Sequence, residues 1–300
     1  MNNSYQANHS KSVQVQPELN MAQLLQLNYI QGIYRLAGFL LLFDKNQRPY
    51  WKLLVSDVNG TVAMFMFEQP NCANELAHGT FIEVEAEIKH YGKSVYVNIT
   101  KLMPINSCYI NKSFALNSLP SYNTPKPQDL VRLKNVIGRI ENSSLVNFLA
   151  DVLVPIEVCI PFTQAPASLN YHHNKPGGLL EHSVEVAEIV SELPLKTQIE
   201  TDLAITGAVL HDIGKIKSLD GGMRRMETGK WVDHGSLTLE VCSDGLAILD
   251  KCNSLFANIL RHIWTCRSPG ARYGYESKLA IADAVQLADR FSARNAVNPL

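Results

Sequence analysis

Residues from about 30 to 103 alternate between apolar and polar side chains as half-buried strands do. In TFIEVEAEIKH (80–90), apolar residues take every second position and glutamates stand between them, which places the two kinds on opposite faces of a strand. SVYVNIT (94–100) repeats the pattern, and Asn59-Gly60 joins two strand-like runs as a tight hairpin does. With IYRLAGFLLLF (33–43) in front, this predicts about five strands, enough for a small closed barrel.

The pattern then changes and predicts a second, helical domain. Residues 105–128 are rich in Pro, Asn and Ser and are expected to form a linker, whereas residues 129–300 carry apolar residues at helical spacing. Residues 1–28, rich in Asn, Gln and Ser, are expected to be mobile. The predicted fold is therefore α+β and multidomain, with a β-barrel over 29–104 followed by an all-α helical bundle.

Histidine and aspartate side chains interrupt the apolar faces of three predicted helices. His182 lies on the apolar face of GGLLEHSVEVAEIVSEL, and His211 and Asp212 follow the apolar start of AVLHDIGKI. In ESKLAIADAVQLADRFSAR, Asp289 lies on the packed face, whereas Asp283 lies on the polar face, where a solvated ion pair is expected.

Each polar group has an ordinary explanation when taken alone, such as a hydrogen-bonded core histidine or a helix-capping aspartate. Two histidines and two aspartates that face one core are harder to explain this way, because a buried charge is costly unless it is paired or binds a metal. Imidazole nitrogens with carboxylate oxygens suit a divalent ion such as Mn, Mg, Fe, Ni or Zn. The sequence therefore predicts a divalent metal site.

LLEHS, AVLHDIGKI and QLADRFSA together resemble the ordered H…HD…D signature of the HD-domain metal-dependent phosphohydrolases. The ordered set is specific, whereas an HD pair alone would be a weak signal. The resemblance implies an HD phosphohydrolase domain over 129–300, in which His182, His211, Asp212 and Asp289 hold a catalytic divalent metal.

The segment NYHHNKPGGLLEHSVEVAEIV further resembles one branch of that family, the YhaM-type 3′–5′ exoribonucleases. These place an OB-fold ahead of the HD domain, and LLVSDVNGTV is similar to a hairpin of their barrel. The resemblance covers about residues 30–294 and implies an OB-fold nucleic-acid-binding domain over 29–104. The helical half is also similar to the HD region of some conjugative relaxases.

Further histidines and a lysine are candidates for the same site. Some HD proteins bind a second ion through an extra histidine and a later His-His pair; His234 and His262 are candidates, but Ile263 stands where the pair would need its second histidine. One ion is expected and a second stays open.

The catalytic candidates are Asp212, which also ligates and would bridge two ions, Lys215 and His173. Lys215 lies four residues after His211, where it can neutralise developing phosphate charge. His173, with His172 and Lys175 before the Gly177-Gly178 bend, could bind the scissile phosphate or orient metal ligands. Ordinary alternatives are an exposed lysine at a helix end and polar residues on a surface turn.

An OB-type barrel would bind the substrate strand, because such barrels stack bases on aromatic side chains and contact the phosphate backbone with cationic side chains. The principal candidates are Trp51, Lys52, Tyr91 and Lys93. Tyr50, Phe65, Phe67, Tyr96 and Lys89 belong to the same set. The sequence leaves open which aromatic side chains face outward.

Composition adds limits to this picture. The net charge of −1 gives no overall attraction for nucleic acid, so binding would need a local patch. The six cysteines include no C-x-x-C pair and are expected to be reduced thiols. No run of eighteen apolar residues and no signal-peptide core is present, so a cytoplasmic protein without a membrane partner is expected.

The function expected from these observations is metal-dependent phosphodiester hydrolysis, as a 3′–5′ exonuclease on single-stranded RNA or DNA. Two alternatives stay open: an HD nucleotidase acting on mononucleotides, and a non-catalytic nucleic-acid-binding accessory of a mobile element. A homo-oligomer is compatible with each of them.

Overall fold

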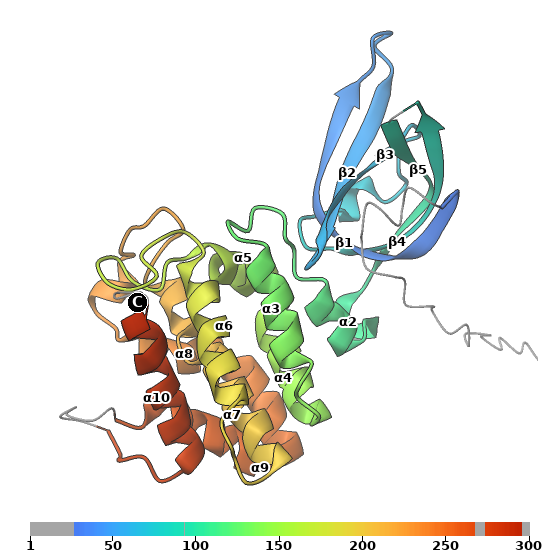
Figure 1. The fold of residues 1–300 in the computed structure, drawn as a ribbon. Helices are drawn as coiled ribbons and strands as arrows, with labels where there is room; N and C mark the ends of the chain where they lie inside the picture. The colour runs from blue at the N-terminus through green and yellow to red at the C-terminus, as the bar shows by residue number, and fades with distance from the viewer. Residues whose placement is uncertain (1–26, 93, 268–273, 296–300) are drawn as a thin grey trace, which may run out of the picture.

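The computed structural model describes residues 27–92, 94–267 and 274–295. It contains a closed barrel and a bundle of helices, which lie side by side in Figure 1. The predicted fold class is confirmed. Of the N-terminal segment predicted to be mobile, residues 1–26 lie outside the described residues.

Five strands form the barrel in the order β1-β2-β3-β5-β4, and a short parallel pairing of β3 with β5 closes it. Inward side chains at alternate positions fill one apolar core, as the period-two pattern requires. The strands are β1 (Tyr29–Phe43), β2 (Pro49–Asp57), β3 (Gly60–Met66), β4 (Phe81–Tyr91) and β5 (Ser94–Ile105).

The predicted hairpin joins β2 to β3, and its tip anchors the barrel on the helices. Asp57 pairs with Gly60 across the two-residue turn, and its carboxylate accepts hydrogen bonds from the backbone N–H groups of Asn59 and Gly60. Val58, 1% exposed, belongs to the apolar core of the helical bundle. The backbone N–H of Val58 donates to the carbonyl of Asn117. The β2–β3 turn therefore attaches the barrel to the helical bundle.

The helical bundle follows a packed connecting segment. In the stretch proposed as a linker, Ile110, Ala115 and Leu116 are buried, and the 3-10 helix η2 (Ser107–Tyr109) and the helix α2 (Lys112–Asn117) form. The helices that follow are α3 (Gln128–Ile137), α4 (Ser143–Leu153), α5 (Ile156–Gln164), α6 (Gly178–Ser191), α7 (Gln198–Leu210), η3 (Ile213–Lys217), α8 (His234–Val241), α9 (Ser243–Thr265) and α10 (Ala280–Asn295). Their apolar faces share one large core.

Candidate metal centre

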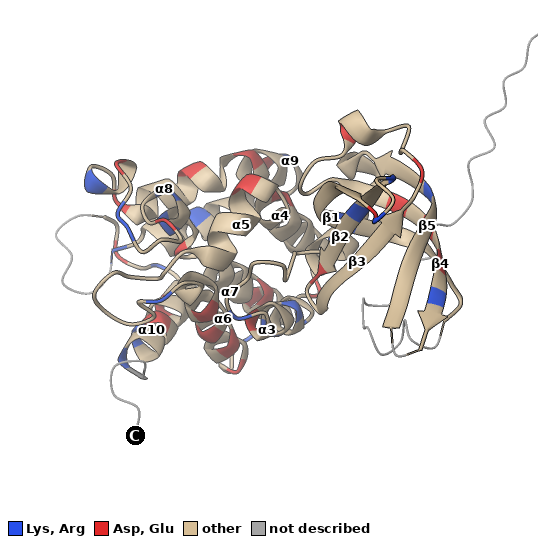
Figure 2. Ribbon diagram, turned by 90° about the horizontal axis from the view of Figure 1, so that it is seen from above, with Lys and Arg blue, Asp and Glu red and all other residues tan. Residues whose placement is uncertain are grey.

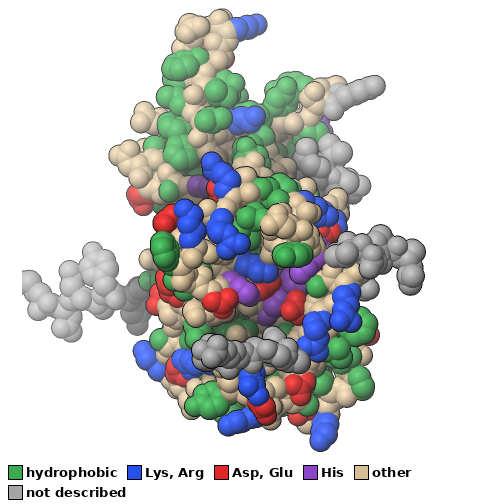
Figure 3. All heavy atoms as spheres, turned by 90° about the vertical axis from the view of Figure 1, so that its left-hand side faces the viewer, with side chains coloured by type: hydrophobic (Ala, Val, Ile, Leu, Met, Phe, Trp, Pro, Cys, Tyr) green, Lys and Arg blue, Asp and Glu red, His purple; other side chains and the backbone are tan. Residues whose placement is uncertain are grey.

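Four elements of the bundle carry the side chains expected to bind metal. His182 lies in the second turn of α6, and His211 is the C-cap residue of α7. Asp212 follows at the start of η3, and Asp289 lies in α10. Figure 3 shows histidine and acidic side chains gathered on one face of the helical part, with lysine and arginine side chains around them.

Two glycines let the chain approach itself closely around these residues. A Cβ on Gly178 would lie 2.0 Å from the carbonyl oxygen of His173, and one on Gly214 would lie 2.1 Å from that of His234. Neither position accepts a side chain without a shift of the backbone. The loop before α6 and the start of α8 are therefore held against the elements that carry the candidate ligands.

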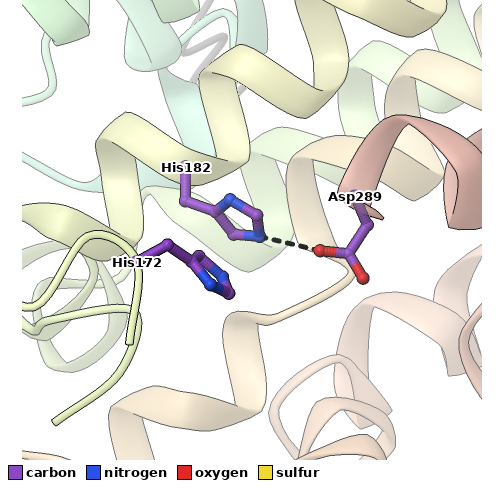
Figure 4. A group of neighbouring side chains, drawn as sticks. All are labelled: His172, His182 and Asp289. Carbon is purple, nitrogen blue, oxygen red and sulfur yellow. Dashed lines mark ion pairs between the residues drawn. The ribbon is translucent and has the colours of Figure 1, made fainter. Parts of the chain in front are cut away.

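The ligand atoms of the four side chains lie close together. Nε2 of His182 lies 3.2 Å from Nε2 of His211 and 3.1 Å from Oδ1 of Asp289. Oδ2 of Asp212 lies 3.6 Å from Nε2 of His182 and 3.4 Å from Nε2 of His211. Figure 4 shows the His182 ring and the Asp289 carboxylate pointing toward each other. Asp283 lies on the exposed face of α10.

Hydrogen bonds on the far side of each imidazole fix which nitrogen carries the proton. Nδ1 of His211 lies 2.8 Å from the carbonyl oxygen of Ala208, which can only accept, so Nδ1 is the protonated nitrogen. Nδ1 of His182 lies 3.0 Å from Oγ of Ser292, which donates its own proton to Glu185. Ser292 therefore accepts from Nδ1 of His182. In the neutral rings, both Nε2 atoms present lone pairs to the common point.

These lone pairs and carboxylate oxygens repel one another unless a cation stands among them. Burial lowers the pKa of His182, so its ring is neutral at pH 7 and supplies no proton to this point. The donor set of two imidazole nitrogens and two carboxylate oxygens is one that divalent transition metals accept. The residues present therefore fit a divalent metal ion.

Asp212 is held in its ionised form by its surroundings. Burial alone would raise its pKa, but the positive charge of Lys215 keeps the pKa well below the usual range for aspartate. Oδ2 accepts from Nζ of Lys215, and Oδ1 lies 3.3 Å from Nε2 of His234. The two oxygens thus face different partners, which is the arrangement that a bridging carboxylate requires.

The two histidines expected to serve a second ion have different surroundings. His234 lies beside Asp212, as described, and is about half exposed. Nε2 of His262 instead accepts a hydrogen bond from the backbone N–H of Lys278, so the structure does not bring His262 to the other ligands. Among the described residues, neither His234 nor His262 belongs to the histidine and carboxylate groups whose ligand atoms converge, but His234 does lie beside Asp212.

His172 and His173 contact different groups although they are adjacent in the sequence. The His172 ring lies beside that of His182, with centroids 5.0 Å apart, and its ligand atoms lie near those of His182 and Asp289 (Figure 4). His173 has positive φ, and its ring also lies near that of His182, with centroids 5.3 Å apart, but its ring nitrogens lie beside Glu181 and Glu185 and only 5% of its side chain is exposed. His172 is therefore the member of the pair that faces the predicted metal.

His173 lies within a buried network behind His182. Its Nδ1 lies 3.2 Å from Glu181 and its Nε2 lies 3.1 Å from Glu185. Burial alone would lower the pKa of His173, but hydrogen bonds and charge from these two carboxylates raise it. Since both ring nitrogens have protein partners, contact of His173 with a scissile phosphate is not supported by its geometry. Figure 2 shows the row of acidic residues along α6 to which both glutamates belong.

Lysine side chains neutralise the outer end of this network. Glu181 accepts from Nζ of Lys126 at 2.7 Å and lies 2.8 Å from Nζ of Lys175. Burial alone would raise the pKa of Glu181, but these hydrogen bonds and that of His173 lower it to about 2. Lys175, proposed from the sequence beside His173, thus belongs to this network.

The barrel presents a row of aromatic side chains on its outer surface, which come from β2, β3, β4 and β5 and from the residue that follows β3. We call this row the aromatic strip. Neighbouring ring centroids lie 5.7 to 6.3 Å apart, and Phe67 and Tyr91 are the most exposed members, at 67% and 65%. The members are Tyr50, Phe65, Phe67, Tyr96 and Tyr91.

The other predicted nucleic-acid contacts are placed differently. Trp51 stacks on Phe39, with ring centroids 5.7 Å apart, and packs against the barrel core. Trp51 is therefore not a member of the aromatic strip, and its contact with nucleic acid stays a prediction. Lys52 pairs in register with Phe65 and so lies along the strip. Lys93 lies outside the described residues.

Comparison with protein families bears on this geometry directly. Residues 179–294 match the HD domain family model. The match spans His182, His211, Asp212 and Asp289 and, as expected from the sequence, supports a metal-dependent phosphohydrolase.

Relatives of known activity extend the similarity beyond the HD domain. The 3′–5′ exoribonuclease YhaM of Bacillus subtilis (strain 168) is 22% identical over 235 residues, 76% of this chain and 73% of the relative. YhaM of Oceanobacillus iheyensis is 26% identical over 218 residues, 68% of this chain and 66% of the relative. YhaM of Halalkalibacterium halodurans is 24% identical over 198 residues, or 64% and 60% of the two chains.

No single helix in the described part of the chain has the length and apolar composition to cross a membrane. Helices α4 and α5, bent by 82° at the break between them, pass that test only when taken as a pair.

The HD domain contains supporting residues that sequence reasoning missed. Ser292 and Glu185 orient His182, and Glu181 holds His173. A sequence signal exists for Ser292, which lies three residues after Asp289 and so on the same face of α10. No comparable signal distinguishes Glu185 from the other glutamates of α6, because its role depends on a helix more than a hundred residues away.

Removing the Ser292 hydroxyl should weaken metal binding by the HD domain. We expect Ser292→Ala to lower metal affinity by about 10- to 100-fold, the usual cost of losing a group that orients a ligand. Titration of the metal-free protein with Mn, followed by calorimetry, measures this. Ser183→Ala is the matched control, since Ser183 is buried on α6 beside His182 and its hydroxyl has no hydrogen-bond partner in the part of the chain that the structure describes. Equal affinities of the two variants would contradict the orienting role.

Replacing Glu181 should destabilise the HD domain by an amount that depends on pH. Because the pKa of Glu181 falls from 4.5 to about 2 on folding, its contribution is present above pH 4.5 and is lost as the pH falls toward 2. We expect Glu181→Gln to lower the free energy of unfolding by about 2 kcal/mol at pH 7 and by less in acid. Urea denaturation measures this, with exposed Glu192→Gln as the control; a loss that is independent of pH would contradict it.

Proposed function

We propose that this protein is a metal-dependent 3′–5′ exonuclease that acts on single-stranded RNA or DNA. The observation that carries the proposal is the convergence of two unprotonated Nε2 atoms and two carboxylates on one point. His182, His211, Asp212 and Asp289 are the proposed ligands of one divalent ion, Mn, Mg, Fe or Ni. His234, through the second oxygen of Asp212, is the proposed start of a second ion site.

A bound divalent ion supplies a water molecule of lowered pKa and polarises a phosphoryl oxygen. The residues of this chain would then have separate tasks. Asp212 ligates and orients, while Lys215, whose Nζ lies beside Asp212, binds a non-bridging oxygen and neutralises charge that develops on the phosphate. His172 faces the same region and is proposed to contact the substrate phosphate. His173 is proposed to be a positioning residue.

The aromatic strip is proposed to bind the single strand. Every base has a face that stacks on an aromatic ring, so a row of exposed rings holds a strand without reading its sequence. Lys52 and Lys89 lie along the strip, because they pair in register with Phe65 and Tyr96. Such a local arrangement is what a chain of nearly neutral net charge needs in order to bind a polyanion.

The 3′–5′ polarity is proposed from the named activity of the YhaM relatives. It is tested with single-stranded RNA and DNA labelled at the 5′ end and incubated with the metal-loaded protein. We expect a ladder of shortening labelled products, because each cut at the 3′ end leaves the label on the strand. Immediate release of labelled mononucleotide would show the opposite polarity. Intact strands with rapid hydrolysis of free nucleotides would instead establish the nucleotidase, and no hydrolysis of either would favour the binding accessory.

A further inference from the structure

A cavity of about 620 Å³ lies where the barrel meets the helical bundle. The barrel contributes Arg35, His78 and Phe81 to its lining, and the helices contribute Lys112 and the first residues of α5. Cys108 and Asp151 also line it. The volume is in the range of small-molecule sites. None of the residues proposed for metal binding lines this cavity.

Arg35 is an unusual lining residue because it is only 3% exposed. Its Nη2 donates to the carbonyl of Val154, at the end of α4, and its guanidinium lies 5.6 Å from the centre of the Phe81 ring. Nε and Nη1 have no hydrogen-bond partner among the described residues. A buried cation with two unsatisfied donors is costly unless a further acceptor is present.

The neighbouring groups do not supply that acceptor. Asp151 pairs with Lys112 at 2.5 Å, and the two charges cancel. Glu157 lines the cavity but is exposed to solvent and forms no ion pair with Arg35 in the described part of the chain. Burial raises the pKa of the nearby Cys159 thiol to about 11, so this group is neutral at pH 7. Among the residues described, the positive charge of Arg35 is therefore left without a contacting counterion.

The amino end of α5 adds further donors on the same lining. Pro155, the N-cap residue of α5, supplies no side-chain hydrogen bond, and Pro155 and Ile156 both line the cavity. In α5 the N–H groups of Val158 and Cys159 donate to the carbonyl of Pro155, which leaves those of Ile156 and Glu157 without a partner among the described residues. Free N–H groups at the start of a helix favour an anion. Arg35 and these N–H groups therefore both favour an anionic group. The apolar lining suits a less polar part of the same ligand.

We propose that this junction cavity is a binding site for a phosphate group carried by a molecule of about nucleotide size, separate from the metal centre. The forked donors of Arg35 match phosphate oxygens. Because Arg35 of the barrel also donates to the carbonyl of Val154 at the end of α4, a ligand on Arg35 would lie against both domains. The proposal does not depend on the exonuclease activity proposed above, because it involves none of the metal-centre residues.

Alkylation of Cys108 tests the site directly in the full chain. Cys108 is exposed and lines the cavity, whereas Cys252 is exposed on α9 and serves as the internal control. With EDTA present to keep the metal centre empty, we expect AMP to slow maleimide labelling of Cys108 and not of Cys252, as followed by peptide mass spectrometry. Adenosine should not protect Cys108, and inorganic phosphate should compete with AMP.

Substitution of Arg35 supplies the second arm. We expect Arg35→Met to weaken AMP protection by about 10- to 100-fold, the usual result of losing hydrogen bonds to a charged group. Arg35→Lys, which keeps the charge without the fork, should lie between Arg35→Met and the unaltered protein. A short oligonucleotide that protects Cys108 at lower concentration than AMP would support the same site and assign the phosphate to a bound strand.

Three results would overturn the proposal: Cys108 labelled equally fast with and without AMP, equal protection by adenosine, or full protection in Arg35→Met. Circular dichroism checks that Arg35→Met is folded. Should it fail to fold, Arg35→Lys and the competition by inorganic phosphate still decide the question.

Discussion

We expect the Asp212→Asn variant to lose metal-dependent hydrolysis by about three orders of magnitude or more. A metal ion stabilises transition-state charge by several kcal/mol, and about 1.4 kcal/mol corresponds to tenfold in rate. Asn keeps the shape of Asp212 but removes its negative charge. That charge is present at pH 7 in the unaltered protein, because Lys215 holds the pKa of Asp212 well below the usual range. Initial rates on a labelled single strand, at saturating Mn, measure the loss.

Asp283→Asn is the matched control for this experiment. Asp283 lies on the same helix as Asp289 but on its exposed face, so its replacement should leave the rate within about twofold, as is usual for surface substitutions. Circular dichroism should show a folded helical domain in both variants. An Asp212→Asn protein that is folded and still hydrolyses the strand at the original rate would contradict the proposed site.

The second large effect is expected from the aromatic strip. Replacing Phe67 and Tyr96 together with alanine should weaken binding of a long single strand by about 10- to 100-fold or more, since each base stacked on an aromatic ring contributes about 1–3 kcal/mol. Hydrolysis of a small phosphodiester should be unchanged, because the strip lies on the barrel and the proposed catalytic side chains lie on the helices. Fluorescence anisotropy and initial rates measure the two effects.

Tyr109→Ala is the control for an exposed aromatic residue outside the strip, since Tyr109 is 82% exposed and lies in η2. It should leave strand affinity almost unchanged. If the double variant bound long strands as tightly as the unaltered protein, the barrel would have to be assigned another role.

The helical spacing of apolar residues was enough to predict part of the ligand set. A histidine or aspartate on the apolar face of a helix must point into the bundle, so His182 and Asp289 could be distinguished from Asp283 by position alone. The same reasoning was weaker for His262, whose ring nitrogen is occupied by the backbone of Lys278. It was also weaker for His173, because a positive-φ residue in a loop has no periodic face from which its direction can be inferred.

The barrel shows the same division. Alternation predicted the strands and the Asn59-Gly60 hairpin, but YWKLLVSD mixes apolar residues on both faces and so did not tell Trp51 from Tyr50. In the folded chain Trp51 faces the barrel core and Tyr50 faces outward beside Phe65. That difference depends on the register between β2 and β3, which is set by the turn and the closed core.

The sequence by itself determined the strands, the helices and the inward direction of His182 and Asp289, because period-two and period-3.6 patterns follow from local backbone geometry. It did not determine what stands behind each ligand. Only the tertiary structure brought Ser292 of α10 to Nδ1 of His182 and left Nε and Nη1 of Arg35, in a cavity between two domains, without a hydrogen-bond partner among the described residues. Such contacts join residues about a hundred positions apart, and their formation depends on how whole elements pack rather than on any local pattern of residues.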